Sequence, residues 1–73
     1  MTQRDQLTHM QVRIARIAAE RWELPIGEVG RLFRRYQAFE YLRDGFGIFH
    51  VEGDEAVWED LLAYLKSRGC EYA

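Results

Sequence analysis

The side chains that could do acid–base or nucleophilic chemistry in this chain are few and widely spaced. His50 follows an apolar run, where an imidazole could act as a general base or bind a metal ion, but Ser67 and Cys70 lie in the last turn and the tail and make no triad with it. The other histidine is His9, and two distant histidines without cysteine neighbours do not make a zinc motif. We therefore interpret His50 as a structural residue that bonds a backbone carbonyl, a helix end or Asp60. We expect no catalytic, metal-binding or cofactor-binding residue.

Asp60 is expected at the border of the apolar face of the last helix. Burying a carboxylate without a partner is costly, so an acid in that position needs a hydrogen-bonding or charged neighbour. A predicted turn at Gly53 separates Asp60 from His50 along the chain. We therefore expect the Asp60 carboxylate to pair with His50 or with an arginine of the first two helices.

Basic and acidic residues are divided between the two halves of the chain. Residues 1–36 hold seven arginines and four acids, whereas residues 37–73 hold three basic and eight acidic residues, so balances of +3 and −5 give the net charge of −2. Such a chain can place its halves against each other or offer a basic face to an acidic partner.

The outer face of the predicted second helix carries Arg31, Arg34 and Arg35. In a helix-turn-helix they could contact phosphates, in a protein interface they could serve as its basic half, and in the plainest interpretation they are a solvated face. The acidic second half of the chain disfavours nucleic acid. We therefore predict that these arginines and Tyr41 contact another protein, with a small DNA-binding regulator as the alternative. The aromatic residues that fit the predicted apolar faces least well are Tyr41, Tyr72 and Trp22, so we expect the partner contacts of aromatic residues among these three.

Length and composition predict one small domain over residues 1–73. A chain of this length buries only about 60% of its unfolded surface, so 48% apolar residues suffice for one core but not for a deep substrate cavity as well. The amino terminus is polar, and no apolar run approaches the roughly 20 residues of a membrane span. A single cysteine excludes an intramolecular disulfide. We expect a cytoplasmic protein that is not an enzyme, uses no cofactor and does not contact membranes; a homodimer is allowed.

Apolar spacing predicts an all-α domain, a compact bundle of about four short helices. The first helix is expected over about residues 5–22, with Pro25 ending it and opening the second helix. A third short helix is expected over residues 37–42, and the last begins where Asp54 caps its first turn and ends at Gly69. The apolar faces of the first two helices are Leu7, Met10, Ile14, Ile17 and Ala18, and Ile26, Val29, Leu32, Phe33 and Tyr36.

The segment over residues 43–53 follows neither the helical nor the strand period. It holds Ile48, Phe49 and Val51, which are too apolar for a free loop. We therefore expect the segment to lie on the core, as a helical turn or as an extended stretch.

The chain resembles a known protein family, most specifically in its second half. The residues that carry the resemblance are Glu28-Val29, Leu32-Phe33, Tyr36, Phe39-Glu40-Tyr41-Leu42, Phe49-His50, Gly53, Val57, Asp60-Leu61 and Tyr64-Leu65-Lys66-Ser67-Arg68-Gly69. They are similar to a family of very small bacterial proteins of unknown function, with a Leu-His-Thr-Gln-Gly turn before a Val-x-x-Asp-Ile helix and a closing Tyr-Leu-Lys-x-x-Gly. This chain has Phe49 and Val51-Glu52 where that turn has Leu and Thr-Gln.

The resemblance implies a compact helical protein and no catalytic residue. Such proteins are often encoded beside ADP-ribosyltransferase-like proteins, in arrangements suggestive of toxin–antitoxin pairs. By this analogy the chain would be a small protein-binding module that neutralises a toxin-like partner, with His50, Gly53, Asp54 and Asp60 as its structural motif.

Overall fold

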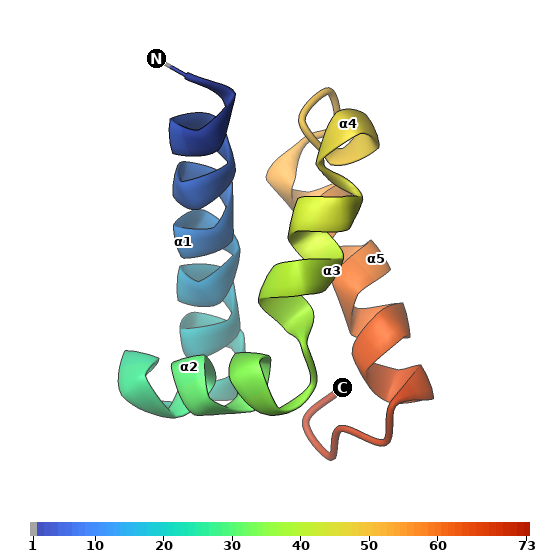
Figure 1. Cartoon of the computed structure of the whole chain (residues 1–73). Helices are drawn as coiled ribbons and strands as arrows, with labels where there is room; N and C mark the ends of the chain where they lie inside the picture. Colours follow the sequence, from blue (N-terminus) through green and yellow to red (C-terminus); the bar gives the residue numbers. More distant parts are fainter. Residues whose placement is uncertain (1) are drawn as a thin grey trace.

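The computed structural model describes residues 2–73, and within this range the chain forms five α-helices and no strand. The helices are α1 (Gln3–Trp22), α2 (Ile26–Arg35), α3 (Ala38–Asp44), α4 (Phe46–Phe49) and α5 (Asp54–Ser67). In Figure 1, α1 runs along one side, α2 crosses the lower end, and α3, α4 and α5 form the other side. The predicted all-α class is confirmed; four helices have seven residues or more, and α4 is a single additional turn.

The ends of α1 follow from the residues found there. The Thr2 hydroxyl oxygen accepts a hydrogen bond from the backbone N–H of Asp5 (3.2 Å), and the Asp5 carboxylate lies in the first turn, where it meets the positive end of the helix dipole. At the other end Glu23 adopts a left-handed φ of 55°, directly before Leu24-Pro25. The helix therefore ends at Trp22 as predicted and begins two residues before residue 5.

Pro25 is the N-cap of α2, with a φ of −59° that suits the start of a helix. Val29 and Phe33 are fully buried, as their spacing predicted. Ile26, however, is 55% exposed, so its assignment to the core is wrong. The first turn of α2 extends beyond the side of α1 in Figure 1, which agrees with the exposure of Ile26.

The segment over residues 43–53 is helical rather than extended. It contains the end of α3, the turn of α4 and the connection to α5. The start of α3 is one residue later than predicted because Gln37 has a left-handed φ of 58°, and its end, at Asp44, is two residues later. Phe49 is buried, but Ile48 and Val51 are 69% and 75% exposed. Placing Ile48 and Val51 on the core is therefore wrong, because a single helical turn directs only one of its sides inward.

The start of α5 differs from its prediction. Gly53 is the N-cap, in extended conformation, and Asp54 is the first helical residue. Asp54 therefore does not cap the helix, because its carboxylate binds the Arg13 guanidinium of α1 instead (Nε–Oδ2 3.0 Å). The end is as predicted, since Gly69 has a left-handed φ of 85° that other residues adopt only with strain.

The core lies between α1 and the helices opposite it. Its most completely buried side chains are Met10, Ile14, Ala18, Val29, Phe33, Ala38, Leu42, Val57, Trp58, Leu61 and Leu65. Cys70 lies in the tail after α5, as expected, but this part of the tail is packed on the core and leaves the residue only 5% exposed. No helix in residues 2–73 has the length and hydropathy that crossing a bilayer requires.

Candidate functional site

The turn that carries the family resemblance lies between α4 and α5. His50 directly follows α4, and its Nδ1–H donates to the carbonyl oxygen of Phe46 (2.8 Å). The imidazole also stacks on the Phe46 ring, with 5.2 Å between the centroids. His50 therefore closes the single turn of α4, which is the backbone contact expected of a structural histidine.

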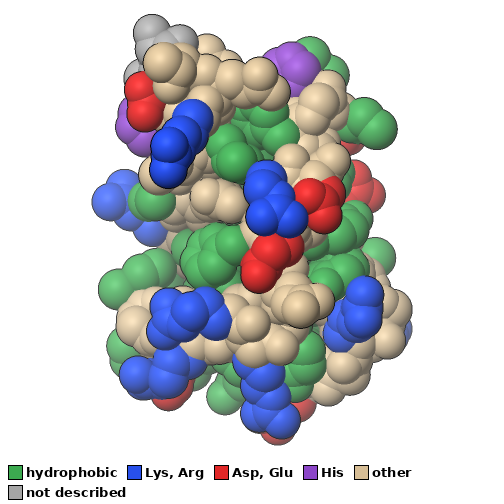
Figure 2. Space-filling view, in the orientation of Figure 1, with side chains coloured by type: hydrophobic (Ala, Val, Ile, Leu, Met, Phe, Trp, Pro, Cys, Tyr) green, Lys and Arg blue, Asp and Glu red, His purple; other side chains and the backbone are tan. Residues whose placement is uncertain are grey.

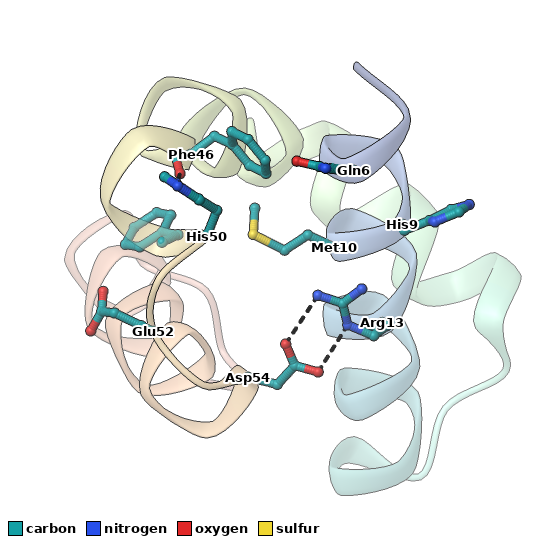
Figure 3. A pocket seen from close by; sticks show the side chains of 9 residues that line it. Gln6, His9, Met10, Arg13, Phe46, His50, Glu52 and Asp54 are labelled. Atoms are coloured by element: carbon teal, nitrogen blue, oxygen red, sulfur yellow. Dashed lines mark hydrogen bonds and ion pairs between the residues drawn. The ribbon is translucent and has the colours of Figure 1, made fainter. Parts of the chain in front are cut away.

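A cleft of about 340 Å³ opens beside this turn, between the amino-terminal half of α1 and the chain from α4 to the start of α5. Figure 3 shows Met10 pointing into the cleft, whereas His9 points away from it. The Arg13 guanidinium donates to both carboxylate oxygens of Asp54 across the cleft, at 3.0 and 3.3 Å. A second pair, Arg21–Glu55 at 2.9 Å, joins the same two helices, so basic residues of α1 do face acids of the second half.

The groups in this cleft do not converge on one point. Arg13 and Asp54 neutralise each other, the His9 ring points away although this residue is part of the cleft wall, and His50 already donates to Phe46. Among residues 2–73, no three histidine, cysteine or acidic side chains are placed to hold a metal ion. The cleft is therefore best described as a clasp between α1 and the α4–α5 turn.

Asp60 lies apart from the clasp. Its side chain is exposed on α5 and makes no ion pair or hydrogen bond with another residue of the range 2–73, so the expected pairing with His50 or an arginine is wrong. The exposed carboxylate is hydrated by solvent and needs no protein partner. The negative charge of Asp60 acts on Tyr41 instead. The pKa of Tyr41 is raised mainly by burial of the phenol and, to a smaller extent, by this charge.

The three arginines of α2 are exposed, as predicted, but Arg31 and Arg35 have close neighbours. Arg31 donates to both carboxylate oxygens of Glu28, with a shortest contact of 2.9 Å. This hydrogen-bonded pair raises the pKa of Arg31 and lowers that of Glu28. The Arg35 guanidinium lies over the Tyr36 ring, 5.5 Å from its centroid. Arg31 is therefore already neutralised within the chain.

The aromatic residues proposed as partner contacts pack largely against the molecule itself. Tyr41 is half-buried, and its ring stacks on Tyr64 with 4.2 Å between centroids. Tyr72 is 40% exposed. Trp22 has three aromatic neighbours within 6.2 Å, namely Phe33, Trp58 and Tyr72. A contact between Tyr41 and a partner stays a prediction.

A second concavity of about 440 Å³ lies where α1, α2 and α3 meet, and we call it the apolar groove. It is lined by Val12, Ala15, Arg16, Ala19, Ile26, Gly30 and Phe39. In Figure 2, hydrophobic side chains reach the surface around this junction, and Lys and Arg side chains surround the lower part of the molecule, where α2 lies. Val12 is 42% exposed, so with Ile26 the groove presents two large aliphatic side chains to solvent.

The sequence does not predict the apolar groove. The spacing of apolar residues assigns Ile26 to the core and carries no sign that α1, α2 and α3 meet at one point. Ala15 and Ala19 lie one turn apart on α1, and Gly30 faces them from α2, so small residues leave the groove open. Val12, Ala15 and Ala19 share one face of α1 at helical spacing, and this pattern of small residues next to a larger aliphatic one is the signal in the sequence that could have indicated the groove.

Two arginines border the apolar groove without an acidic partner. Arg16 lines it from α1. Arg34 folds back along α2, so that its Nη1 lies 3.4 Å from the position that a Cβ on Gly30 would occupy. Neither guanidinium forms an ion pair with a residue of the range 2–73, in contrast to Arg13 and Arg31.

Comparison with known proteins gives one match. A family model described as "Protein of unknown function (DUF3791)" matches residues 9–68, which include the turn, the clasp and the apolar groove. No curated protein and no solved structure matches the chain.

Proposed function

The chain belongs to the DUF3791 family of proteins of unknown function, and on that premise we propose that it is a non-enzymatic module that binds another protein. The apolar groove is the observation that carries this proposal. A concave apolar surface with polar groups at its edge is the usual form of a recognition site. Val12 and Ile26 supply apolar contact area, and Arg16 supplies a charged edge.

The state of the reactive side chains supports a binding role over a catalytic one. His50 donates to the Phe46 carbonyl, the Ser67 hydroxyl donates to the Tyr64 carbonyl (2.6 Å), and Cys70 is buried. A nucleophile needs a general base within hydrogen-bonding reach, and none of these three has one. These contacts support a structural role for each of the three side chains.

The partner that we propose is an ADP-ribosyltransferase-like protein encoded beside this chain, which the chain would neutralise in the cytoplasm. Support comes from the resemblance of its turn and closing helix to small proteins with such neighbours. The alternative, a DNA-binding regulator, has Arg34 and Arg35 in its favour. Against it, Arg31 is neutralised by Glu28, and an exposed Ile26 opens the helix that would have to enter a groove of DNA.

Co-expression of the chain with the adjacent gene product tests the proposal. We expect the two proteins to co-purify as one complex and the growth defect caused by the partner to be relieved. Ile26→Asp should abolish both effects, because it places a charge in the apolar groove. Ile48→Asp is the matched control, since Ile48 is also exposed but lies on α4 at the opposite end of the molecule.

Two outcomes would contradict the proposal. One is a chain that stays free while the partner is produced in folded form. The other is a band shift of duplex DNA at moderate salt that Arg34→Glu removes, which would favour the regulator.

A further inference from the structure

We infer that the segment bound in the apolar groove is an amphipathic α-helix whose apolar side is flanked by carboxylates. This rests on the proposed function, and it adds the chemistry and conformation of the partner. Three features of the groove carry it: its apolar floor, its two free guanidinium groups and the helical backbone of all its walls.

The floor of the groove selects an apolar surface. Its lining includes three residues with little or no side chain, Ala15, Ala19 and Gly30. It also includes two large, exposed aliphatic side chains, Val12 and Ile26. Side chains at positions i, i+3 or i+4 of a partner helix can fill such a depression, as in other helix-in-groove complexes. Burial of these exposed aliphatic groups supplies the favourable free energy of association.

The charges of the groove select an acidic partner. Arg16 on α1 lines the groove, and the Arg34 guanidinium on α2 lies beside Gly30 of its lining. Neither has an acidic neighbour within ion-pair distance among residues 2–73. Arg13, Arg21, Arg31 and Arg43 are, by contrast, each paired with an acid of the chain itself. A carboxylate on each edge of the incoming helix would pair with Arg16 and Arg34 through charge-assisted hydrogen bonds.

The walls of the groove select a helix over an extended peptide. All three wall segments, in α1, α2 and α3, are helical, so the groove offers no strand edge with a row of unpaired N–H and C=O groups. An extended peptide needs an open strand edge for its main-chain hydrogen bonds. A helix already contains its main-chain hydrogen bonds, so the groove has to accommodate only its side chains.

The test uses the full-length chain and synthetic peptides of about 15 residues, near the length at which a helix is stable in water. One peptide has leucines at i, i+3, i+4 and i+7 flanked by glutamates, and the second has lysines in place of the glutamates. Isothermal titration calorimetry measures both. We expect the acidic peptide to bind and the basic peptide to bind at least tenfold more weakly.

Variants locate the bound peptide. Ile26→Asp should abolish binding of the acidic peptide, and Arg16→Glu or Arg34→Glu should each weaken it by about tenfold. Ile48→Asp and Arg4→Glu are the controls, because both residues are exposed and lie away from the groove. All five substituted positions are on the surface, and circular dichroism confirms that each variant folds.

Several results would overturn the inference. Equal binding of the two peptides would remove the charge selection, and binding that survives Ile26→Asp would remove the groove. Sedimentation that shows an Ile26-dependent dimer would assign the groove to a second copy of the chain, and duplex DNA binding lost in Arg16→Glu would assign it to nucleic acid. If neither peptide binds but the co-expressed partner still depends on Ile26, the proposed function stands and the acidic helix is refuted.

Discussion

Gly45 joins α3 to α4 at a point where a side chain has no room. A Cβ built on it would overlap Cε2 of Phe49, a residue that is only 7% exposed. Gly47, two residues later on the same turn, has nothing within 4 Å of its Cβ position. The two glycines therefore serve different purposes: Gly45 makes space for a core ring, while Gly47 only adds flexibility to the backbone.

Substitution of these glycines should have opposite effects. Gly45→Ala forces the Phe49 ring out of its place and should lower the free energy of unfolding by about 1–3 kcal/mol. Gly47→Ala restricts the unfolded chain without a clash and should raise it by roughly 0.5–1 kcal/mol. Urea unfolding monitored by far-ultraviolet circular dichroism measures both, and equal effects would refute the close packing.

Tyr41 should make the stability of the protein sensitive to alkaline pH. Burial and the charge of Asp60 raise its pKa in the folded state above the ordinary value of 10.0, so the folded state holds the phenol proton more tightly than the unfolded state does. The resulting stabilisation is complete below pH 10.0 and is lost as pH rises through the folded pKa. Tyr41→Phe should remove this part of the alkaline loss in a series of thermal unfolding curves, whereas an unchanged pH profile would contradict it.

At the scale of the helices, α5 begins without a side-chain cap. Gly53 has the extended conformation of an N-cap but no side-chain oxygen, and the Asp54 carboxylate is bound to Arg13. The open space at Gly53 accepts a side chain, since nothing lies within 4 Å of its Cβ position. The free N–H groups of the first turn are therefore left to solvent.

A cap introduced at this position should stabilise the helix. Gly53→Ser supplies a hydroxyl oxygen that accepts a hydrogen bond from a backbone N–H of the first turn. We expect the free energy of unfolding of this variant to be about 1 kcal/mol higher than that of Gly53→Ala. Thermal unfolding of the two variants measures the difference. If Ser and Ala were equal, the serine oxygen would not be capping α5.

Periodicity sufficed for the long helices and failed for the short segments. The stripe from Met10 to Ala18 and the pair Val29 and Phe33 have enough turns to define a face, and α1 and α2 were predicted from them. Ile48 and Val51 lie in a stretch too short to define one. Their exposure depends on which elements happen to cover them.

The candidate site was less accessible to sequence reasoning than the fold. His50 and its carbonyl partner are four residues apart, so a local interaction could be anticipated. The pairing proposed for Asp60 and the apolar groove both depend on how separate helices come together. Spacing within one helix has no information about that arrangement, and so the pairing was wrong and the groove was missed.

At the scale of the whole molecule, the chain closes its core without help. Its radius of gyration is 11.4 Å, close to the value of about 11 Å expected for a compact domain of this length. The last residues take part in this closure, with Cys70 buried and Tyr72 against Trp22. A second copy or another protein would therefore cover the apolar groove rather than complete the core.

Cys70 provides a direct measurement of this closure. Because the thiol is 5% exposed, a thiol-specific reagent should modify it at least about tenfold more slowly in the native protein than in the unfolded protein, which corresponds to an opening free energy of about 1.4 kcal/mol or more. Labelling followed by mass spectrometry gives both rates. Equal rates in buffer and in denaturant would show that the carboxyl-terminal residues do not pack on the core.

Both tryptophans of the chain meet at one place. Trp22 near the end of α1 and Trp58 in α5 have ring centroids 5.5 Å apart, at an angle of 55°, with Tyr72 beside them. Indoles this close and fixed at an angle couple their electronic transitions. The tryptophan bands of the near-ultraviolet circular dichroism spectrum consequently report on a single junction, at which the end of the first helix, the last helix and the carboxyl-terminal residues are held together.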